Sequence, residues 1–484
     1  MTIAEIESRL ESGWASERKR LLVRLRAAEL RDFGVLREIW EFLRISELMM
    51  LDILNGRPAN PDHAGKGCAE FGHFLYHLHY PHPQLQALTA RDEVAQAAWN
   101  LAAHAAKPMS TMAQGHLEGL EAKMAAWPVV DGEGVIYGFN QYESLDPNWN
   151  LTLINLIISF FHGRHDFGAT PCVKALIPGS DGRVRLGIVG DWGAGAYGPN
   201  GGAAVAVMKQ LDAMKCDYLF HMGDTYYAGT GGAPYLPPNE EAGNFIRQWA
   251  QHAGRGRSFT LNGNHEMYSG GNGYFPVALG SDVFRHQNAT SYFALTFGKW
   301  VILGLDTAYN APAADMYSRG ILGDQQSAWI REYRQSIGGF DGRKILVLTH
   351  HEGLSFQGDA LTGLFREVAD ALGRAPDIWY WGHLHNGIAY SNASAAGKLG
   401  TKARCVGHSA VPYGFASGLM DSSGHYPVAS VDFFTHTPSP EGGKRVLNGF
   451  ATLELSENGD LTELFFEEGK AAPVWRSVNG VRFA

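Results

Sequence analysis

The chain has 484 residues, of which 45% are hydrophobic and 18% charged. It is long enough for more than one domain and too apolar to be a disordered chain. The net charge of −9 excludes an overall basic surface, so we expect no dedicated nucleic-acid partner and no polybasic membrane anchor. The four cysteines lie far apart without a CxxC pair, which predicts neither a zinc site nor a disulfide framework.

The N-terminal part of the sequence shows no sign of export or membrane insertion. Residues 1–14 carry charges throughout and lack the apolar stretch of a secretory signal. The longest apolar run, residues 151–161, is shorter than the roughly 20 residues that cross a bilayer. We therefore expect a cytoplasmic protein without a membrane segment.

Residues 1–178 have the pattern of a mainly helical domain. Apolar residues recur at helical spacing in 6–25, 33–54 and 91–106. His73 and His77 are one helical turn apart, but no carboxylate or cysteine completes a metal site with them, so packing is the favoured interpretation. We leave the role of this domain unassigned.

Residues 179–484 show the alternation of strands and helices that is typical of an α/β domain. Strands are predicted at 184–190, 218–223, 258–263, 300–306, 344–350 and 377–382, helices at 203–214, 240–253, 323–336 and 360–373, and a closing β-hairpin at 448–469. The boundary between the two domains is predicted near 175–183.

Five of these strands end in side chains that bind metals. They are Asp191, Asp224, Asn264 with His265, His350, and His383 with His385. One aspartate after a strand is usually a cap, but five such tips are hard to explain by capping. Because ligands bind beyond the carboxyl ends of strands in open α/β sheets, we expect these side chains to meet at one edge.

The types of side chain at the strand tips indicate which metals could bind and which reaction they could support. Carboxylate, amide and imidazole suit iron, zinc and manganese, and no cysteine joins the set. A carboxylate can bridge two ions, and centres with two ions about 3.5–4 Å apart suit phosphoryl transfer. The sequence therefore predicts a two-metal site acting on phosphate esters.

These motifs, in order, resemble the signature of the calcineurin-like metallophosphoesterases over roughly residues 184–467. The resemblance implies a four-layer αββα sandwich, to which the helical N-terminal domain is added. One motif departs from the family pattern, because Gly193 stands where a metal-binding histidine is expected. In the purple acid phosphatase branch, a tyrosine three residues after the second aspartate replaces that histidine, and Tyr227 has this spacing.

The resemblance also implies a role for each residue. The first ion, Fe(III), would take Asp191, Asp224, Tyr227 and His385; the second, Fe, Zn or Mn, would take Asp224, Asn264, His350 and His383. Asp224 would bridge the ions, and a metal-bound hydroxide would attack phosphorus. His265 would protonate the leaving alcohol or bind a phosphoryl oxygen, or else only brace its loop. Tyr226 is expected to pack, or to lie behind the ligands.

Three further residues are weaker candidates for substrate contact. His351 follows a ligand directly and is either a substrate contact or a packed neighbour of the metal site. His408 and Tyr413 lie in the segment 407–414, after the last ligands, and are candidates for lining the pocket.

We expect a small-molecule phosphate ester as substrate and a purple acid phosphatase-like phosphomonoesterase as the activity. The first alternative is a phosphodiesterase with Mn or Zn at both sites and Tyr227 merely packed. An alternative of another class is a helical interaction module that carries a degenerate phosphoesterase domain. The sequence does not indicate how many copies of the chain associate.

Overall fold

The computed structural model describes residues 129–130, 136–137, 142, 164–197, 201–229, 240–249, 256–313, 316–411, 419–420, 427–435, 437–438, 444–445 and 447–483. The predicted N-terminal helices at 6–25, 33–54 and 91–106 lie outside these residues. Among the described residues, no helix is both long and apolar enough to cross a membrane.

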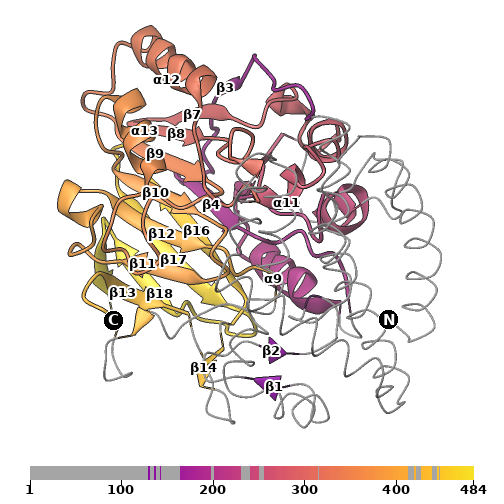
Figure 1. Ribbon diagram of the computed structural model, residues 1–484. Coiled ribbons are helices and arrows are strands. Elements are labelled where there is room, and N and C mark those ends of the chain that lie inside the picture. Colours follow the sequence, from indigo (N-terminus) through magenta and orange to yellow (C-terminus); the bar gives the residue numbers. More distant parts are fainter. Residues whose placement is uncertain are drawn as a thin grey trace, which may run out of the picture.

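Two large sheets form the centre of the described structure (Figure 1). The first has eight strands in the order β13-β11-β12-β10-β9-β8-β7-β3, and the second has seven in the order β19-β18-β17-β16-β4-β5-β6. The strands of the first sheet are β3 (Cys172–Ala175), β7 (Phe293–Phe297), β8 (Trp300–Gly304), β9 (Lys344–Thr349), β10 (Ile378–Trp381), β11 (Gly387–Tyr390), β12 (Lys402–Val406) and β13 (Val431–Phe434). Those of the second are β4 (Val184–Val189), β5 (Tyr218–His221), β6 (Ser258–Thr260), β16 (Gly449–Leu455), β17 (Leu461–Glu467), β18 (Trp475–Val478) and β19 (Val481–Phe483).

Helices and short two-stranded pairs complete the described elements. The helices are α9 (Gly202–Ala213), η2 (Glu241–Ile246), α10 (Arg247–Trp249), α11 (Asn264–Met267), η3 (Tyr274–Ala278), η4 (Arg285–Gln287), α12 (Asp324–Ser336), α13 (Gly363–Leu372) and η6 (Gly397–Leu399). The pairs are β1 (Val129–Val130) with β2 (Ile136–Tyr137), and β14 (Thr437–Pro438) with β15 (Lys444–Arg445).

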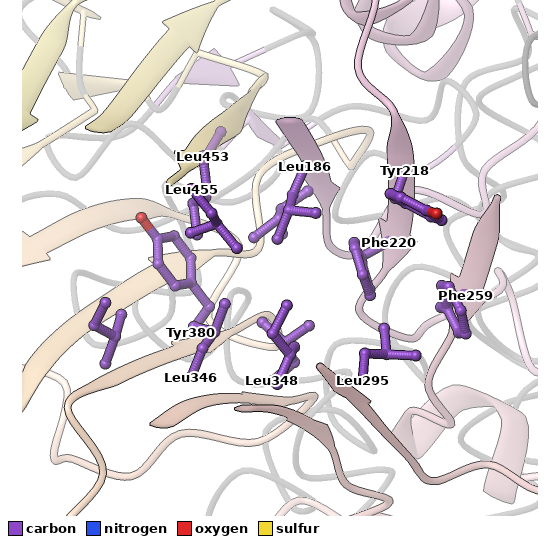
Figure 2. Packing of buried hydrophobic residues seen from close by; sticks show 14 of the residues in the cluster. Leu186, Tyr218, Phe220, Phe259, Leu295, Leu346, Leu348, Tyr380, Leu453 and Leu455 are labelled. Carbon is purple, nitrogen blue, oxygen red and sulfur yellow. The ribbon is translucent and has the colours of Figure 1, made fainter. Parts of the chain in front are cut away.

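The two sheets pack face to face over a continuous apolar core (Figure 2). Successive side chains of a strand point to opposite faces of its sheet. On β9, Leu346 and Leu348 therefore enter the core between the sheets, whereas Ile345 and Val347 face the other way. This explains why the strand is apolar without interruption: both of its faces are covered.

Helices cover the outer face of each sheet. Side chains of α12 and α13, such as Ile330 and Val368, pack on the outer face of the eight-stranded sheet. Side chains of α9 and α10, such as Val207 and Trp249, pack with Val189 of β4 on the outer face of the other sheet. The predicted four-layer αββα sandwich is confirmed for this part of the chain.

Strand β3 lies before the domain boundary that the sequence predicts. It pairs in parallel with β7, with Cys172 opposite Phe293, and forms one edge of the eight-stranded sheet. Residues 164–168 also contact the sandwich, through hydrogen bonds from Arg164 to Tyr309 and from Gln325 to Gly168. The unit that packs as one body therefore extends N-terminally at least to residue 164.

Candidate metal centre

The five predicted strand tips converge at one edge of the sandwich. In the seven-stranded sheet, β4, β5 and β6 run parallel, so the residues after them share an edge. In the eight-stranded sheet, β9 and β10 run parallel and carry His350 and His383 beyond their ends. Ligand atoms of Asp191, Asp224 and His350 all lie within 4.8 Å of one another. The two sheets thus each contribute part of one cluster.

Asp224 lies at the centre of this cluster, and its two carboxylate oxygens face different groups. Oδ1 is 3.4 Å from Nε2 of His350. Oδ2 accepts a hydrogen bond of 3.3 Å from the hydroxyl of Tyr226. The carboxylate is 1% exposed. A buried carboxylate whose oxygens point to two separate donor groups has the geometry that a bridging ligand needs.

The first donor group surrounds Asp191. Its Oδ1 lies 3.2 Å from Nε2 of His385 and accepts a hydrogen bond of 3.1 Å from the hydroxyl of Tyr226. That hydroxyl is also 2.9 Å from Nε2 of His385. Two carboxylates, a phenol and an imidazole therefore share one small buried space.

The second donor group surrounds Asn264. Its Oδ1 lies 2.8 Å from Nε2 of His350 and 3.1 Å from Nδ1 of His383. The other ring nitrogen of His350 lies 2.9 Å from the carbonyl oxygen of Met222, which fixes the ring orientation and leaves Nε2 directed at the cluster. Together with Oδ1 of Asp224, this group offers two oxygens and two nitrogens.

The structure differs from the sequence-based expectation in its choice of tyrosine. The hydroxyl among the carboxylates belongs to Tyr226, whereas the ring of Tyr227 packs 4.8 Å from the ring of Tyr142 in the apolar layer outside the sheet. The backbone N–H of Tyr227 donates to Glu240, and its carbonyl oxygen contacts Nδ1 of His265. The spacing taken from the family predicts Tyr227, whereas the path of the chain after Asp224 brings the Tyr226 hydroxyl to the carboxylates.

The charges of the cluster favour a bound cation. Burial, followed by the nearby charge of Asp224, raises the pKa of Asp191 well above its ordinary value. Burial acts in the same direction on Asp224, but His350, His265 and His383 outweigh it and hold the pKa of Asp224 below its ordinary value. Two carboxylates this close cannot both ionise at low cost unless a cation compensates them. The donor set therefore fits hard or borderline metal ions.

Four of these residues have backbone conformations that non-glycine residues rarely adopt. Their φ angles are 57° for Asp191, 76° for Asp224, 64° for His383 and 45° for His385. Such left-handed conformations are costly, and they persist where the surrounding structure enforces them, often at functional sites. The fold holds these side chains in place at the expense of local backbone energy.

Glu266 supports the centre from behind, and the sequence did not single it out. Its Oε2 accepts hydrogen bonds from the backbone N–H groups of Gly263, at 2.8 Å, and Asp224, at 3.1 Å. It therefore ties the tip of β5 to the tip of β6. Gly263 must be small, because a Cβ there would lie 2.2 Å from Oδ1 of Asp224. In the sequence, the position of Glu266 directly after Asn264 and His265 is the feature that could have indicated this supporting role.

His265 lies beside the bridging position. Its backbone N–H donates to Oδ1 of Asp224 at 3.0 Å, and its Nε2 is 3.9 Å from Oδ2 of the same carboxylate. The ring packs between those of Tyr226, at 4.5 Å, and Tyr268, at 4.8 Å. The side chain is 12% exposed, so it reaches the surface of the cluster.

Two of the three weaker candidates are buried side chains. His351 is fully buried, with Nδ1 2.9 Å from Oγ1 of Thr307 and Nε2 2.7 Å from the carbonyl oxygen of Tyr317. His408 is 1% exposed, and its ring lies against Gly387 and Gly449 rather than among the ligands. Burial lowers the pKa of His408 to about 3. Tyr413 lies outside the described residues.

Comparison with known families now identifies the segment that carries this cluster. Residues 184–387 match the family model of the calcineurin-like phosphoesterases. This segment is a calcineurin-like phosphoesterase domain. The match begins at β4 and includes Asp191, Asp224, Asn264, His350 and His385. The metal-type side chains agree with a metal-dependent hydrolase of phosphate esters.

Other comparisons add little to this. Among curated proteins, none matches the chain. Among solved structures, the chain is similar to a purple acid phosphatase from yellow lupin (Lupinus luteus) seeds, with 19% identity and a TM-score of 0.40 over 62% of this chain. The chain spans about half of that protein, 54% of its length. The similarity is too low to decide the branch of the phosphoesterase domain.

Proposed function

We propose that the phosphoesterase domain holds two metal ions and hydrolyses small phosphate monoesters, as the purple acid phosphatases do. The observation that carries the proposal is the position of Asp224, whose two oxygens face two donor groups. The first ion would be held by Asp191, Asp224, Tyr226 and His385. The second would be held by Asp224, Asn264, His350 and His383.

The placement of Tyr226 supports iron at the first position. A free phenol has a pKa near 10 and loses its proton at neutral pH only beside a strongly acidic cation such as Fe(III). Tyr226 thus takes the role that the family spacing gives to Tyr227. Iron, zinc and manganese all suit the second donor group, which contains no sulfur ligand.

When bound, such ions lower the pKa of water and neutralise charge on phosphoryl oxygens. The residues of the chain perform the remaining tasks. Asp224 and Glu266 hold the tips of β5 and β6 in register. His265, within reach of the phosphoryl position and partly exposed, would bind a phosphoryl oxygen or protonate the leaving alcohol. The Tyr227 carbonyl oxygen, which Nδ1 contacts, only accepts, so Nδ1 carries a proton and Nε2 would donate from the doubly protonated ring.

The visible spectrum and metal content of the purified protein test this proposal. Wild-type protein should contain two metal ions per chain and show a tyrosinate-to-iron absorption band. Tyr226→Phe should remove the band, because it removes the phenol oxygen. Tyr227→Phe, a matched control one residue away, should keep the band.

Other outcomes would contradict single parts of the proposal. A band lost in Tyr227→Phe and kept in Tyr226→Phe would restore the family spacing. A colourless protein with two Mn or Zn ions would reject iron but keep the phosphoesterase. Full retention of both ions in Asp224→Ala would contradict the bridging role. Rates on 4-nitrophenyl phosphate and bis(4-nitrophenyl) phosphate separate monoester from diester preference.

A further inference from the structure

The described parts of the loop between β8 and α12, residues 305–313 and 316–323, adopt a conformation that their own sequence does not favour. Met316 and Tyr317 are consecutive non-glycine residues with φ angles of 59° and 55°. Left-handed conformations of this kind are costly for non-glycine residues. Both side chains are buried, Met316 at 3% and Tyr317 at 2% exposure. Contacts from outside the loop must therefore hold it.

The inner contact comes from His351, next to the metal ligand His350. The His351 ring nitrogens lie 2.9 Å from Oγ1 of Thr307 and 2.7 Å from the carbonyl oxygen of Tyr317. Since a carbonyl only accepts, Nε2 carries the proton, and Nδ1 accepts from the Thr307 hydroxyl. Both nitrogens are thus used by the loop. The ring also packs 4.9 Å from that of His350 and 4.8 Å from that of His383.

The outer contact comes from Arg164, which precedes the phosphoesterase domain in sequence. Its Nη1 donates to the carbonyl oxygen of Tyr309 at 2.6 Å, and its Cζ lies 5.2 Å from the centre of the Tyr317 ring. The hydroxyl of Tyr309 in turn donates to the carbonyl oxygen of His165 at 2.7 Å. Arg164 therefore holds the loop at two points, one of them the strained residue.

Neighbouring side chains fix the segment that carries Arg164. The ring of His165 stacks on Phe275 at 5.0 Å with an interplanar angle of 6°. Phe167 packs against Tyr309 at 4.5 Å and against Tyr292 at 5.3 Å. Such aromatic contacts contribute beyond the burial of area alone. The segment 164–168 is thus anchored on both sides of the loop.

Ring contacts connect the loop to residues of the metal centre. The ring of Tyr317 is 6.4 Å from that of Tyr268, which is 4.8 Å from that of His265. Asn264 donates from Nδ2 to the hydroxyl of Tyr268 at 2.8 Å. A row of packed rings therefore connects the strained residue of the loop to a proposed metal ligand and to the proposed proton donor.

We propose that His351 and Arg164 are positioning residues that hold this loop in place, and that the loop forms the wall beside the alcohol part of the ester. His351 is then neither a metal ligand nor a substrate contact. Substrate preference depends in part on a segment that lies outside the family-matched residues. The claim about substrate rests on the proposed function, whereas the claim about the loop does not.

Hydrogen exchange of the full chain tests the loop directly. In Arg164→Ala and in His351→Phe, amides of residues 305–323 should exchange about tenfold faster, the factor that corresponds to one lost hydrogen bond. Amides of α13 should not change. Arg164→Lys keeps a cation and a donor and should restore slow exchange. Arg331→Ala, an exposed arginine on α12, is the control. Unchanged exchange of the loop in both variants would overturn the proposal, whatever the activity.

Kinetics test the effect on substrate. With 4-nitrophenyl phosphate and adenosine 5′-monophosphate, both variants should raise KM by about tenfold and change the ratio of kcat/KM between the two esters. A lower folded fraction would instead scale kcat for both esters equally. The double variant should fall short of the product of the single effects, because both residues act on one loop.

Two further results would each overturn one part of the proposal. Folded His351→Phe protein that lacks one of the two metal ions would make His351 a ligand. Equal KM values in wild type and both variants, with faster exchange of the loop, would reject the substrate wall. If wild-type protein with both ions hydrolyses no ester, the proposed function fails, and hydrogen exchange still decides the fate of the loop.

Discussion

Asp306, at the residue scale, is a buried acid beside the metal centre rather than part of it. It follows β8, is fully buried, and accepts hydrogen bonds from Asn262, Ser291 and the backbone of 308–309. Through Asn262 it supports the segment that leads to Asn264. Burial raises the pKa of Asp306 to about 6, in spite of these hydrogen bonds.

The pH dependence of stability should report this carboxyl. The folded protein keeps the proton of Asp306 up to about pH 6, whereas the unfolded chain loses it near 3.8. The contribution of Asp306 to stability is therefore greatest at low pH and is lost as the pH rises through 6. Compared with Asp306→Asn, which cannot ionise, wild type should lose about 2 kcal/mol of unfolding free energy between pH 4.5 and 7.5.

Urea unfolding of both proteins at the two pH values measures this difference. The asparagine can be accommodated, because Oδ1 of Asn262 has no hydrogen-bond partner in the described part of the chain and can accept from the new amide. A difference that stays constant across the range would mean that the pKa of Asp306 is close to its ordinary value.

Residue types at the strand tips could be predicted from the sequence, because strand ends and metal-binding side chains are local features. Asp191, Asp224, Asn264, His350, His383 and His385 lie together as expected. The orientation of a side chain within a turn is not a local feature. For this reason the sequence spacing could not show that the Tyr226 hydroxyl lies nearest the carboxylates, or that the rings of His351 and His408 are buried.

At the scale of elements, one buried ion pair joins the two sheets. Arg404 of β12 donates from Nε to Glu463 of β17 at 2.9 Å, and both side chains are at most 3% exposed. The hydroxyls of Tyr380 and Ser477 also donate to Glu463, and the guanidinium lies 4.9 Å from the ring of Trp475. The charges are paired and fully hydrogen-bonded, as burial requires.

Removing one partner of this pair should weaken the sandwich strongly. Arg404→Ala leaves the Glu463 carboxylate buried and uncompensated, so we expect a loss of about 3–5 kcal/mol of unfolding free energy. Arg183→Ala breaks an ion pair with Glu454 on the surface. This variant should change the free energy of unfolding by less than about 1 kcal/mol. Urea unfolding of both variants measures the contrast. Equal effects would mean that the pair does not join the sheets energetically.

The central elements could be predicted from sequence periodicity. Strands β4, β5, β6, β8, β9 and β10 are short apolar runs with turn signals at their ends, and the hairpin β16–β17 alternates clearly. Strands such as β3, β11 and β13 were missed, because they are short edge or near-edge strands whose identity depends on pairing with β7, β12 and β11, respectively. Pairing is a tertiary property, and short segments do not encode it.

For the whole molecule, metal ions should contribute to stability. The carboxylates of Asp191 and Asp224 are buried side by side, and ions that bind only the folded state stabilise it by mass action. An ion present at 100 times its dissociation constant contributes about 2.7 kcal/mol. Removing the ions with a chelator should therefore lower the melting temperature by about 5–10 °C.

Thermal unfolding with and without the chelator, monitored by circular dichroism, measures the shift. Asp224→Ala, which lacks the bridging carboxylate, is the control and should respond much less to the chelator. An identical response of the two proteins would show that the chelator acts elsewhere.

The pairing of β4 with β16 has a consequence for synthesis on the ribosome. Asp191 follows β4, yet one of the strand's two neighbours in the sheet, β16, is translated only after His385, the last of the candidate ligands. Until then, one side of β4 remains an unpaired edge that is open to association with other nascent chains. The strand next to Asp191 therefore reaches its final pairing only after β16 has been translated. Ribosomal pausing before residue 449 would prolong the period in which a chaperone must cover this edge.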